Sequence, residues 1–183
     1  ESGAVHAMTA GQTVMLCPTL GPATVQNQAE RLALRGIDLM DAPMSGGPLR
    51  AQDGSMSLMV ACSEPVWQRS QGLLNALSQR VFRVGTRPGD AARTKLVNNL
   101  LAAVNLVGAA EAMALAERLG LDPAGTLSVI EASSGQSWIG SDRMRRALAD
   151  DFEPRAHVSL LAKDTGLAVQ AAEEVAFNPL LGR

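Results

Sequence analysis

The chain contains no tyrosine and only two histidines and two cysteines among its 183 residues. The lack of tyrosine excludes every mechanism with a tyrosine general acid, and the scarcity of histidine disfavours histidine-centred catalysis. His6 and His157 lie far apart, and no CxxC or HExxH spacing occurs. We therefore predict no zinc or other metal site. Cys17 and Cys62 each lie in a short apolar run, which is typical of a buried free thiol.

An excess of either charge is also missing, because 16 Lys and Arg balance 18 Asp and Glu to a net charge of −2. Without a basic stripe to neutralise phosphates, we expect no nucleic-acid partner. The uncharged run 96–110 is too short and too rich in asparagine to predict a membrane span. The first residues lack the basic-then-apolar order of a signal peptide, so a cytoplasmic location is the default expectation.

The first half of the chain alternates between two kinds of hydrophobic pattern. Short apolar runs that are typical of strands begin at Thr13, Ile37, Ser55 and Arg80. Helical periodicity occupies 22–34 and 64–77. This alternation predicts an α/β unit, in which the later strands could also pair antiparallel.

The second half has helical patterns and no further strand. One long helix is predicted over 90–119, where Gly120 ends it. Shorter helices are predicted over 124–132, 138–148 and 158–175. The fold class predicted from the sequence is therefore an α/β part followed by an all-α domain built on a long inter-domain helix.

The segment "DAPMSGG" places a glycine-rich loop directly after a predicted strand. Asp41 to Pro43 end the strand, and Ser45, Gly46 and Gly47 follow. Ligands of open α/β sheets bind beyond the carboxyl ends of strands, and adjacent glycines let backbone N–H groups approach a ligand closely. The loop suits a carboxylate or hydroxyl group. The alternative is a plain turn in which glycine supplies a positive φ.

Lys95 and Asn99 lie four residues apart near the start of the long helix, so they share one face. The helix N-terminus and an apolar wall would both lower the pKa of the lysine, which could then transfer a proton near neutral pH. The alternative is a solvated lysine at a helix end. A surface ion pair accounts for Lys163 and Asp164, and Trp138 is typical of a core side chain.

Four segments, in this order, resemble the β-hydroxyacid dehydrogenase family, which includes 3-hydroxyisobutyrate, tartronate semialdehyde and L-threonate dehydrogenases. They are "PTLGP" from Pro18, "DAPMSGG", "KLVNNLL" from Lys95 and "KDTGLA" from Lys163. The resemblance covers nearly the whole chain. Ala91 departs from it, since the family usually has glycine there, and the chain has no GxGxxG dinucleotide fingerprint.

The resemblance implies that hydride is transferred between a small 3-hydroxy acid and NAD or NADP. It makes Lys95 the general acid/base. It assigns substrate binding to Ser45, Gly46, Gly47 and Asn99, and cofactor binding to Thr19 and Lys163. The sequence identifies neither the hydroxy acid nor the preferred dinucleotide, and it does not rank Arg50, Trp138 and Asp142, which could all tune the pocket.

The resemblance also implies a domain organisation. Residues 1–87 are expected to be the C-terminal part, a remnant, of a Rossmann-type dinucleotide-binding domain, and residues 88–183 an all-helical substrate and dimerisation domain whose C-terminus is incomplete. We expect the chain alone to hold a dinucleotide poorly, and we expect a homo-oligomer, a dimer or tetramer, through the long helix. The alternatives are a non-catalytic helical dimerisation or binding module, or a fragment that is inactive without the missing cofactor-binding half.

Overall fold

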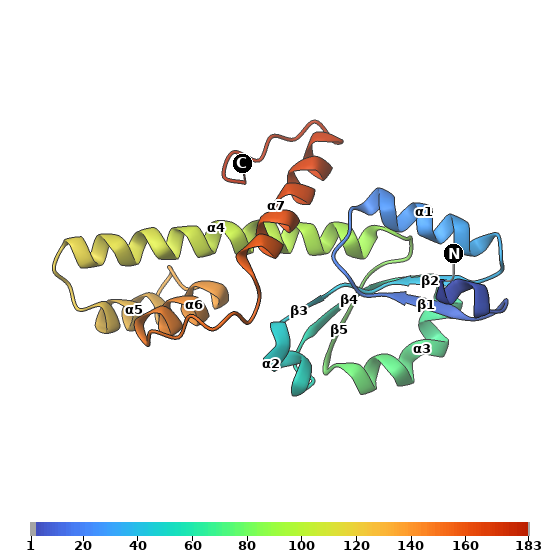
Figure 1. Ribbon diagram of the computed structural model, residues 1–183, viewed down its shortest axis with the longest axis horizontal. Coiled ribbons are helices and arrows are strands. Elements are labelled where there is room, and N and C mark those ends of the chain that lie inside the picture. The colour runs from blue at the N-terminus through green and yellow to red at the C-terminus, as the bar shows by residue number, and fades with distance from the viewer. Residues whose placement is uncertain (1–2, 183) are drawn as a thin grey trace.

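The computed structural model describes residues 3–182, in which a small mixed sheet is followed by helices arranged along one long helix (Figure 1). The strands are β1 (Thr13–Leu16), β2 (Asp38–Asp41), β3 (Met44–Ser45), β4 (Ser57–Ala61) and β5 (Arg80–Gly85). The helices of this part are the 3-10 turn η1 (Ala4–Ala7), α1 (Pro22–Ala33), α2 (Gly47–Gln52) and α3 (Glu64–Leu77).

The sheet combines parallel and antiparallel pairs. β1 pairs parallel with β2, and β4 pairs parallel with β5. β4 also pairs antiparallel with β2 and with the short strand β3, so the antiparallel alternative holds for β4. Because β1 and β2 form a parallel pair, their carboxyl ends lie at the same edge of the sheet, and Asp41 at the end of β2 contacts the start of the long helix. The loops that follow these strands therefore lie where a ligand site is expected.

Alternating side chains of the central strands pack against helices on both faces of the sheet. Leu39 packs with α1 residues, whereas its neighbour Met40 belongs to the cluster that includes Val66 and Leu74 of α3. Successive strand residues point to opposite faces, so a strand covered on both sides is apolar throughout. This explains the continuous apolar runs in the sequence. Cys62 is buried, Cys17 is half-buried, and both are free thiols.

The helical part is organised by α4 (Asp90–Arg118), against which α5 (Pro123–Glu131), α6 (Trp138–Leu148) and α7 (Val158–Glu173) pack. The first turns of α4 pack on the sheet through Ala91 and Ala92, and the rest extends away from it (Figure 1). The small side chain at position 91, where the family usually has glycine, is fully buried in this contact. The boundary between residues 87 and 88 stays a prediction.

We predict that Leu58→Ala destabilises the protein by about 2–5 kcal/mol, because Leu58 is fully buried in β4 and its truncation leaves a cavity. The matched control is Leu73→Ala on α3, where the leucine is 53% exposed and little change is expected. Urea unfolding of both variants measures the difference. Equal losses would show that β4 is not the centre of the core.

Candidate active site

A cleft of about 1270 Å³ runs between the sheet and the helical part. Six of the seven residues predicted as site residues line it: Thr19, Ser45, Gly46, Gly47, Lys95 and Asn99. Lys163, the seventh, lies beside Thr19 at its border. The cleft thus brings together predicted site residues that are as far apart in the chain as Thr19 and Asn99.

The loop at Ser45 begins with the two-residue strand β3 and continues into α2. Gly46 has φ 141° and Gly47 φ 69°, backbone conformations that favour glycine. A Cβ on Gly46 would lie 2.8 Å from side-chain atoms of Arg50, so any other residue there would be strained and would displace Arg50. The sequence analysis missed β3 and α2. Met44 and Ser45 pair with β4, and Pro48 in the first turn starts the helix directly after the glycines.

Lys95 is buried in the second turn of α4, with 6% of its surface exposed. Burial lowers the pKa of its ammonium group, and the carboxylate of Asp164 opposes this shift with a smaller effect. Within residues 3–182, Lys95 makes no hydrogen bond or ion pair, and it lines the cleft. The amine is therefore available to a ligand.

Asn99 and Asp164 form a buried polar pair next to Lys95. Asn99 Nδ2 donates to Asp164 Oδ2 at 2.6 Å, and Asn98 Nδ2 donates to Asn99 Oδ1 at 3.0 Å. The expected ion pair between Lys163 and Asp164 is present, but Asp164 is only 8% exposed, so its carboxylate lies in the interior and not at the surface. The signal in the sequence was a carboxylate within an apolar helix, which in a buried position needs a partner.

Lys163 connects the helical part to the loop after β1. Its Nζ donates to the carbonyl oxygen of Thr19 at 2.9 Å and lies 2.7 Å from Asp164 Oδ1. The contact with Asp164 is an ion pair by distance, but it does not have hydrogen-bond geometry. Lys163 therefore fixes the backbone at Thr19 and brings a positive charge to the buried carboxylate.

Asp41 joins the glycine-loop segment to the helix that carries Lys95. Its carboxylate is 1% exposed, and Oδ2 accepts hydrogen bonds from the backbone N–H groups of Gly89 and Ala92, both at 3.0 Å. Burial raises the pKa of Asp41, and these N–H donors oppose the shift. The carboxylate satisfies two donors at the positive end of α4, a role that the sequence analysis missed.

Trp138, which was expected in the core, is 48% exposed at the start of α6. The expectation was wrong because the helix directs the ring into the cleft, where the guanidinium of Arg50 lies 4.7 Å from the ring centroid. An amphipathic indole at a cleft surface can carry a cation on its face. Trp138 is thus a surface of the site.

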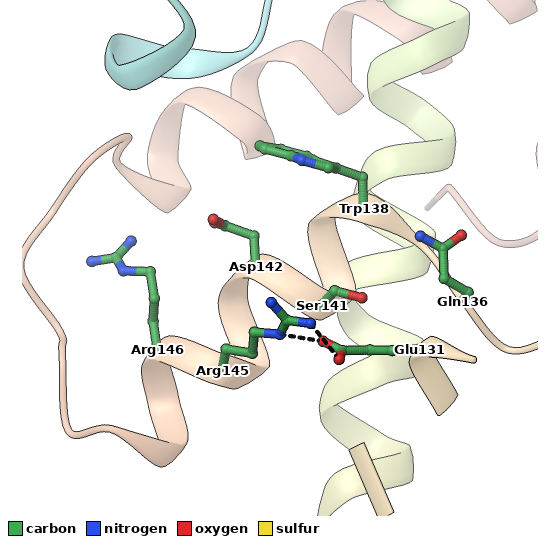
Figure 2. A pocket seen from close by; sticks show the side chains of 7 residues that line it. All are labelled: Glu131, Gln136, Trp138, Ser141, Asp142, Arg145 and Arg146. Carbon is green, nitrogen blue, oxygen red and sulfur yellow. Dashed lines mark hydrogen bonds and ion pairs between the residues drawn. The ribbon is translucent and has the colours of Figure 1, made fainter. Parts of the chain in front are cut away.

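A second, smaller groove of about 430 Å³ lies beside α6 and shares Trp138, Asp142 and Arg146 with the main cleft (Figure 2). Figure 2 shows the guanidinium of Arg145 directed at the carboxylate of Glu131, to which it donates at 2.6 and 2.5 Å. The pair satisfies both groups, and no lysine, histidine or cysteine lines this groove. We do not assign a reaction to it. Within residues 3–182, no three His, Cys, Asp or Glu side chains are placed to hold a metal ion.

Comparisons with known proteins show the family and the fold to which the chain belongs. Residues 89–183 match the family described as "NAD-binding of NADP-dependent 3-hydroxyisobutyrate dehydrogenase", and residues 1–85 match the "NAD binding domain of 6-phosphogluconate dehydrogenase". L-Threonate dehydrogenase of Escherichia coli O6:H1 is 34% identical over 97% of this chain and 59% of its own. 2-(Hydroxymethyl)glutarate dehydrogenase of Eubacterium barkeri is 35% identical over 94% of this chain and 57% of its own.

A crystal structure of 3-hydroxyisobutyrate dehydrogenase from Salmonella typhimurium superposes with a TM-score of 0.92 at 34% identity, over 98% of this chain and 63% of that one. The fold is therefore that of the nicotinamide-dependent dehydrogenases in which a Rossmann-type part precedes a helical part, which confirms the predicted fold class. The chain belongs to the β-hydroxyacid dehydrogenase family. It spans about three fifths of the length of these relatives.

We predict that Asp41→Ala lowers the free energy of unfolding by about 2 kcal/mol or more, because it leaves two buried N–H donors of α4 without an acceptor. Asp122→Ala is the matched control, since Asp122 caps α5 through one exposed hydrogen bond to the N–H of Gly125. Its loss should cost about 1 kcal/mol. Chemical denaturation compares the two variants, and a loss at Asp41 no larger than at Asp122 would contradict the assigned role.

Proposed function

We propose that the protein is an NAD(P)-dependent 3-hydroxyacid dehydrogenase in which Lys95 is the general acid/base. One observation carries the proposal: a buried, unpaired lysine with a lowered pKa lines the same cleft as the Ser45–Gly47 loop and Asn99. Such a combination is typical of functional sites. The substrates named for the relatives, L-threonate, 2-(hydroxymethyl)glutarate and 3-hydroxyisobutyrate, all carry a carboxylate and a hydroxyl on the third carbon, which supports this substrate class.

The residues of the cleft divide the chemistry between them. Backbone N–H groups at Gly46 and Gly47 and the hydroxyl of Ser45 bind the substrate carboxylate, and Asn99 orients the reacting hydroxyl. In oxidation the neutral amine of Lys95 accepts the hydroxyl proton while the carbon loses hydride, because the alkoxide character that drives hydride departure requires that proton to leave. In reduction the ammonium form returns the proton to the carbonyl oxygen.

The residues around Thr19 fit the nicotinamide end of a dinucleotide. Thr19 follows β1 at the carboxyl end of a parallel pair, and it borders the cleft that contains Lys95. At about 1270 Å³ the cleft exceeds what a small hydroxy acid occupies, so it has room for a nicotinamide ring as well. Thr19 and Lys163 would hold the cofactor here, and the bound cofactor supplies the hydride acceptor.

Asp164→Asn should move the pH dependence of hydroxy-acid oxidation to lower pH. Oxidation needs the neutral amine, so its rate rises with pH through the pKa of Lys95. The variant keeps an acceptor for Asn99 but removes the negative charge that raises this pKa, which therefore falls further. In the reverse direction the rate falls with pH, because the ammonium form is required. Initial rates in both directions across pH, measured on the complete protein, test the shift.

The control for this profile is Lys95→Met, which should reduce turnover by roughly 10²–10⁴-fold at every pH and leave the fold intact, since methionine suits the buried site. Turnover that persists in Lys95→Met would refute the role of Lys95. An Asp164→Asn profile that moves to higher pH would instead show that the charge of Asp164 does not act on the amine.

The exposed apolar side chains of α4 favour a homo-oligomer, a dimer or tetramer, formed through this helix. Large apolar side chains outside the cleft are exposed along this helix: Val97, Val107 and Leu115 are each 59–70% exposed. By length and composition α4 could also cross a membrane, with only 17% of its apolar window buried. However, α5, α6 and α7 pack along it and carry ion pairs such as Arg145–Glu131. A bilayer would have to accommodate those charges, whereas a second copy would cover only the apolar face.

A non-catalytic dimerisation module would use this face equally well, but it has no need of a buried lysine facing a glycine loop. We therefore propose that the protein acts as the dehydrogenase and that it does so as the oligomer. We place it in the cytoplasm, without a nucleic-acid or membrane partner.

Leu115→Asp should dissociate the oligomer, because it places a carboxylate in the apolar face of α4, where Leu115 is 59% exposed in the single chain. Leu73→Asp on α3, with a similar exposure of 53%, is the control and should not change the mass. Sedimentation equilibrium of the complete protein measures the assembly. An unchanged mass for Leu115→Asp would exclude this part of α4 from the interface.

A further inference from the structure

Arg50 spans the cleft from the α/β part to the helical part. It lies on α2, three residues after Gly47, and its guanidinium is 4.7 Å from the ring centroid of Trp138 on α6. Both side chains line the cleft that contains Lys95. Residues 3–182 contain two cation–π contacts. The one between Arg50 and Trp138 bridges the two parts at the site, whereas the one between Arg83 and Trp67 lies within the α/β part.

The stem and the head of Arg50 occupy different places. A Cβ on Gly46 would lie 2.8 Å from both Cβ and Cδ of Arg50, so the aliphatic stem packs directly over the substrate loop. The guanidinium continues from there to Trp138 in the helical part. The charge is therefore displaced from the backbone N–H groups of the loop, which we have assigned to the first carboxylate of the substrate.

Arg50 differs from the other arginines that line the cleft, because each of those forms an ion pair with an aspartate. Arg143 pairs with Asp142 at 2.7 Å. Arg146 and Arg155 pair with Asp151 at 3.0 and 3.2 Å. Among the Lys and Arg side chains that line the cleft within residues 3–182, Lys95 and Arg50 are the two without an ion pair. Lys95 is the proposed proton-transfer group, which leaves Arg50 as the cation of the cleft that has an aromatic partner but no ion-pair partner within residues 3–182.

We propose that Arg50 and Trp138 form a subsite for a second carboxylate, so that the substrate is a hydroxy dicarboxylic acid. This inference rests on the proposed function. The indole occupies one face of the guanidinium and leaves its N–H edges free, and these edges match the two oxygens of a carboxylate. In the bound substrate the first carboxylate lies at the Ser45–Gly47 loop, the hydroxyl at Lys95, and the second carboxylate at Arg50.

The test compares two substrates in the complete protein: 2-(hydroxymethyl)glutarate, whose 2-carboxyethyl chain carries the second carboxylate, and 3-hydroxyisobutyrate, which has a methyl group in place of that whole chain. Arg50→Met keeps the stem over Gly46 and removes the charge. It should raise KM for the dicarboxylate by roughly 10- to 100-fold, with little change in kcat and little change in either constant for 3-hydroxyisobutyrate. Trp138→Leu should give a smaller rise for the dicarboxylate alone. Arg31→Met, an exposed arginine of α1, is the control.

Two results would overturn the proposal. An equal rise in KM for both substrates would mean that Arg50 binds the carboxylate they share, and no rise for either would mean that it binds neither. If Arg50→Met does not fold, the same comparison with Arg50→Gln replaces it, checked by circular dichroism.

Failure of the proposed function is recognised separately, by wild-type protein that oxidises neither compound. Calorimetric titration with 2-(hydroxymethyl)glutarate then decides the subsite. Binding that is lost in Arg50→Met but kept in Arg31→Met supports it, and equal binding to both variants, or none to the wild type, overturns it.

Discussion

The buried carboxylate of Asp41 is the contact on which the geometry of the cleft depends. It ends β2 within the segment that continues into the Ser45–Gly47 loop, and it accepts two backbone hydrogen bonds at the start of α4. Lys95 follows Ala92 by three residues on that helix. A rigid helix transmits the position of its first turn to the next, so one buried side chain sets the positions of both the loop and the lysine. A negative charge at a helix N-terminus is favourable, and this offsets part of the free-energy cost of burying the carboxylate of Asp41.

The second constraint is the balance of effects on Lys95. Burial alone favours the neutral amine, and a neutral amine can accept a proton but not donate one. The nearby carboxylate of Asp164 moves the pKa back toward the charged form. Asp164 is itself held by Asn99 on α4 and by Lys163, which also binds the carbonyl of Thr19. The group that tunes the lysine is thus anchored to both parts of the molecule, so a change in their relative position would alter the protonation state of the site.

The sequence was sufficient for what depends on local patterns and insufficient for what depends on distant contacts. The bounds of α3 and α6 agree with the predicted 64–77 and 138–148, because long amphipathic segments carry their own periodicity. β3 and α2, with two and six residues, are too short to show any. Asp41 and Asp164 were missed as functional groups because their partners are 48 to 65 residues away. Trp138 was misassigned because hydrophobicity does not say which side of a helix faces a cleft.

Neither of the two parts of the fold carries the whole candidate site by itself. The α/β part supplies the loop at Ser45 and the cation of Arg50, but no group that could transfer a proton in the cleft. The helical part supplies Lys95, Asn99 and Asp164, but no glycine loop that could hold a carboxylate. Besides the apolar packing of Ala91 and Ala92 on the sheet, three polar or cationic contacts join the two parts in or near the cleft: Asp41 with α4, Lys163 with Thr19, and Arg50 with Trp138. Polar contacts require a defined geometry and are costly when unsatisfied, whereas apolar surfaces can slide. If the interface had only to hold the two parts together, apolar residues such as those abundant elsewhere on α4 would be sufficient. Polar contacts fix the relative position of the Ser45–Gly47 loop and Lys95, and a substrate bound between them requires that fixed position.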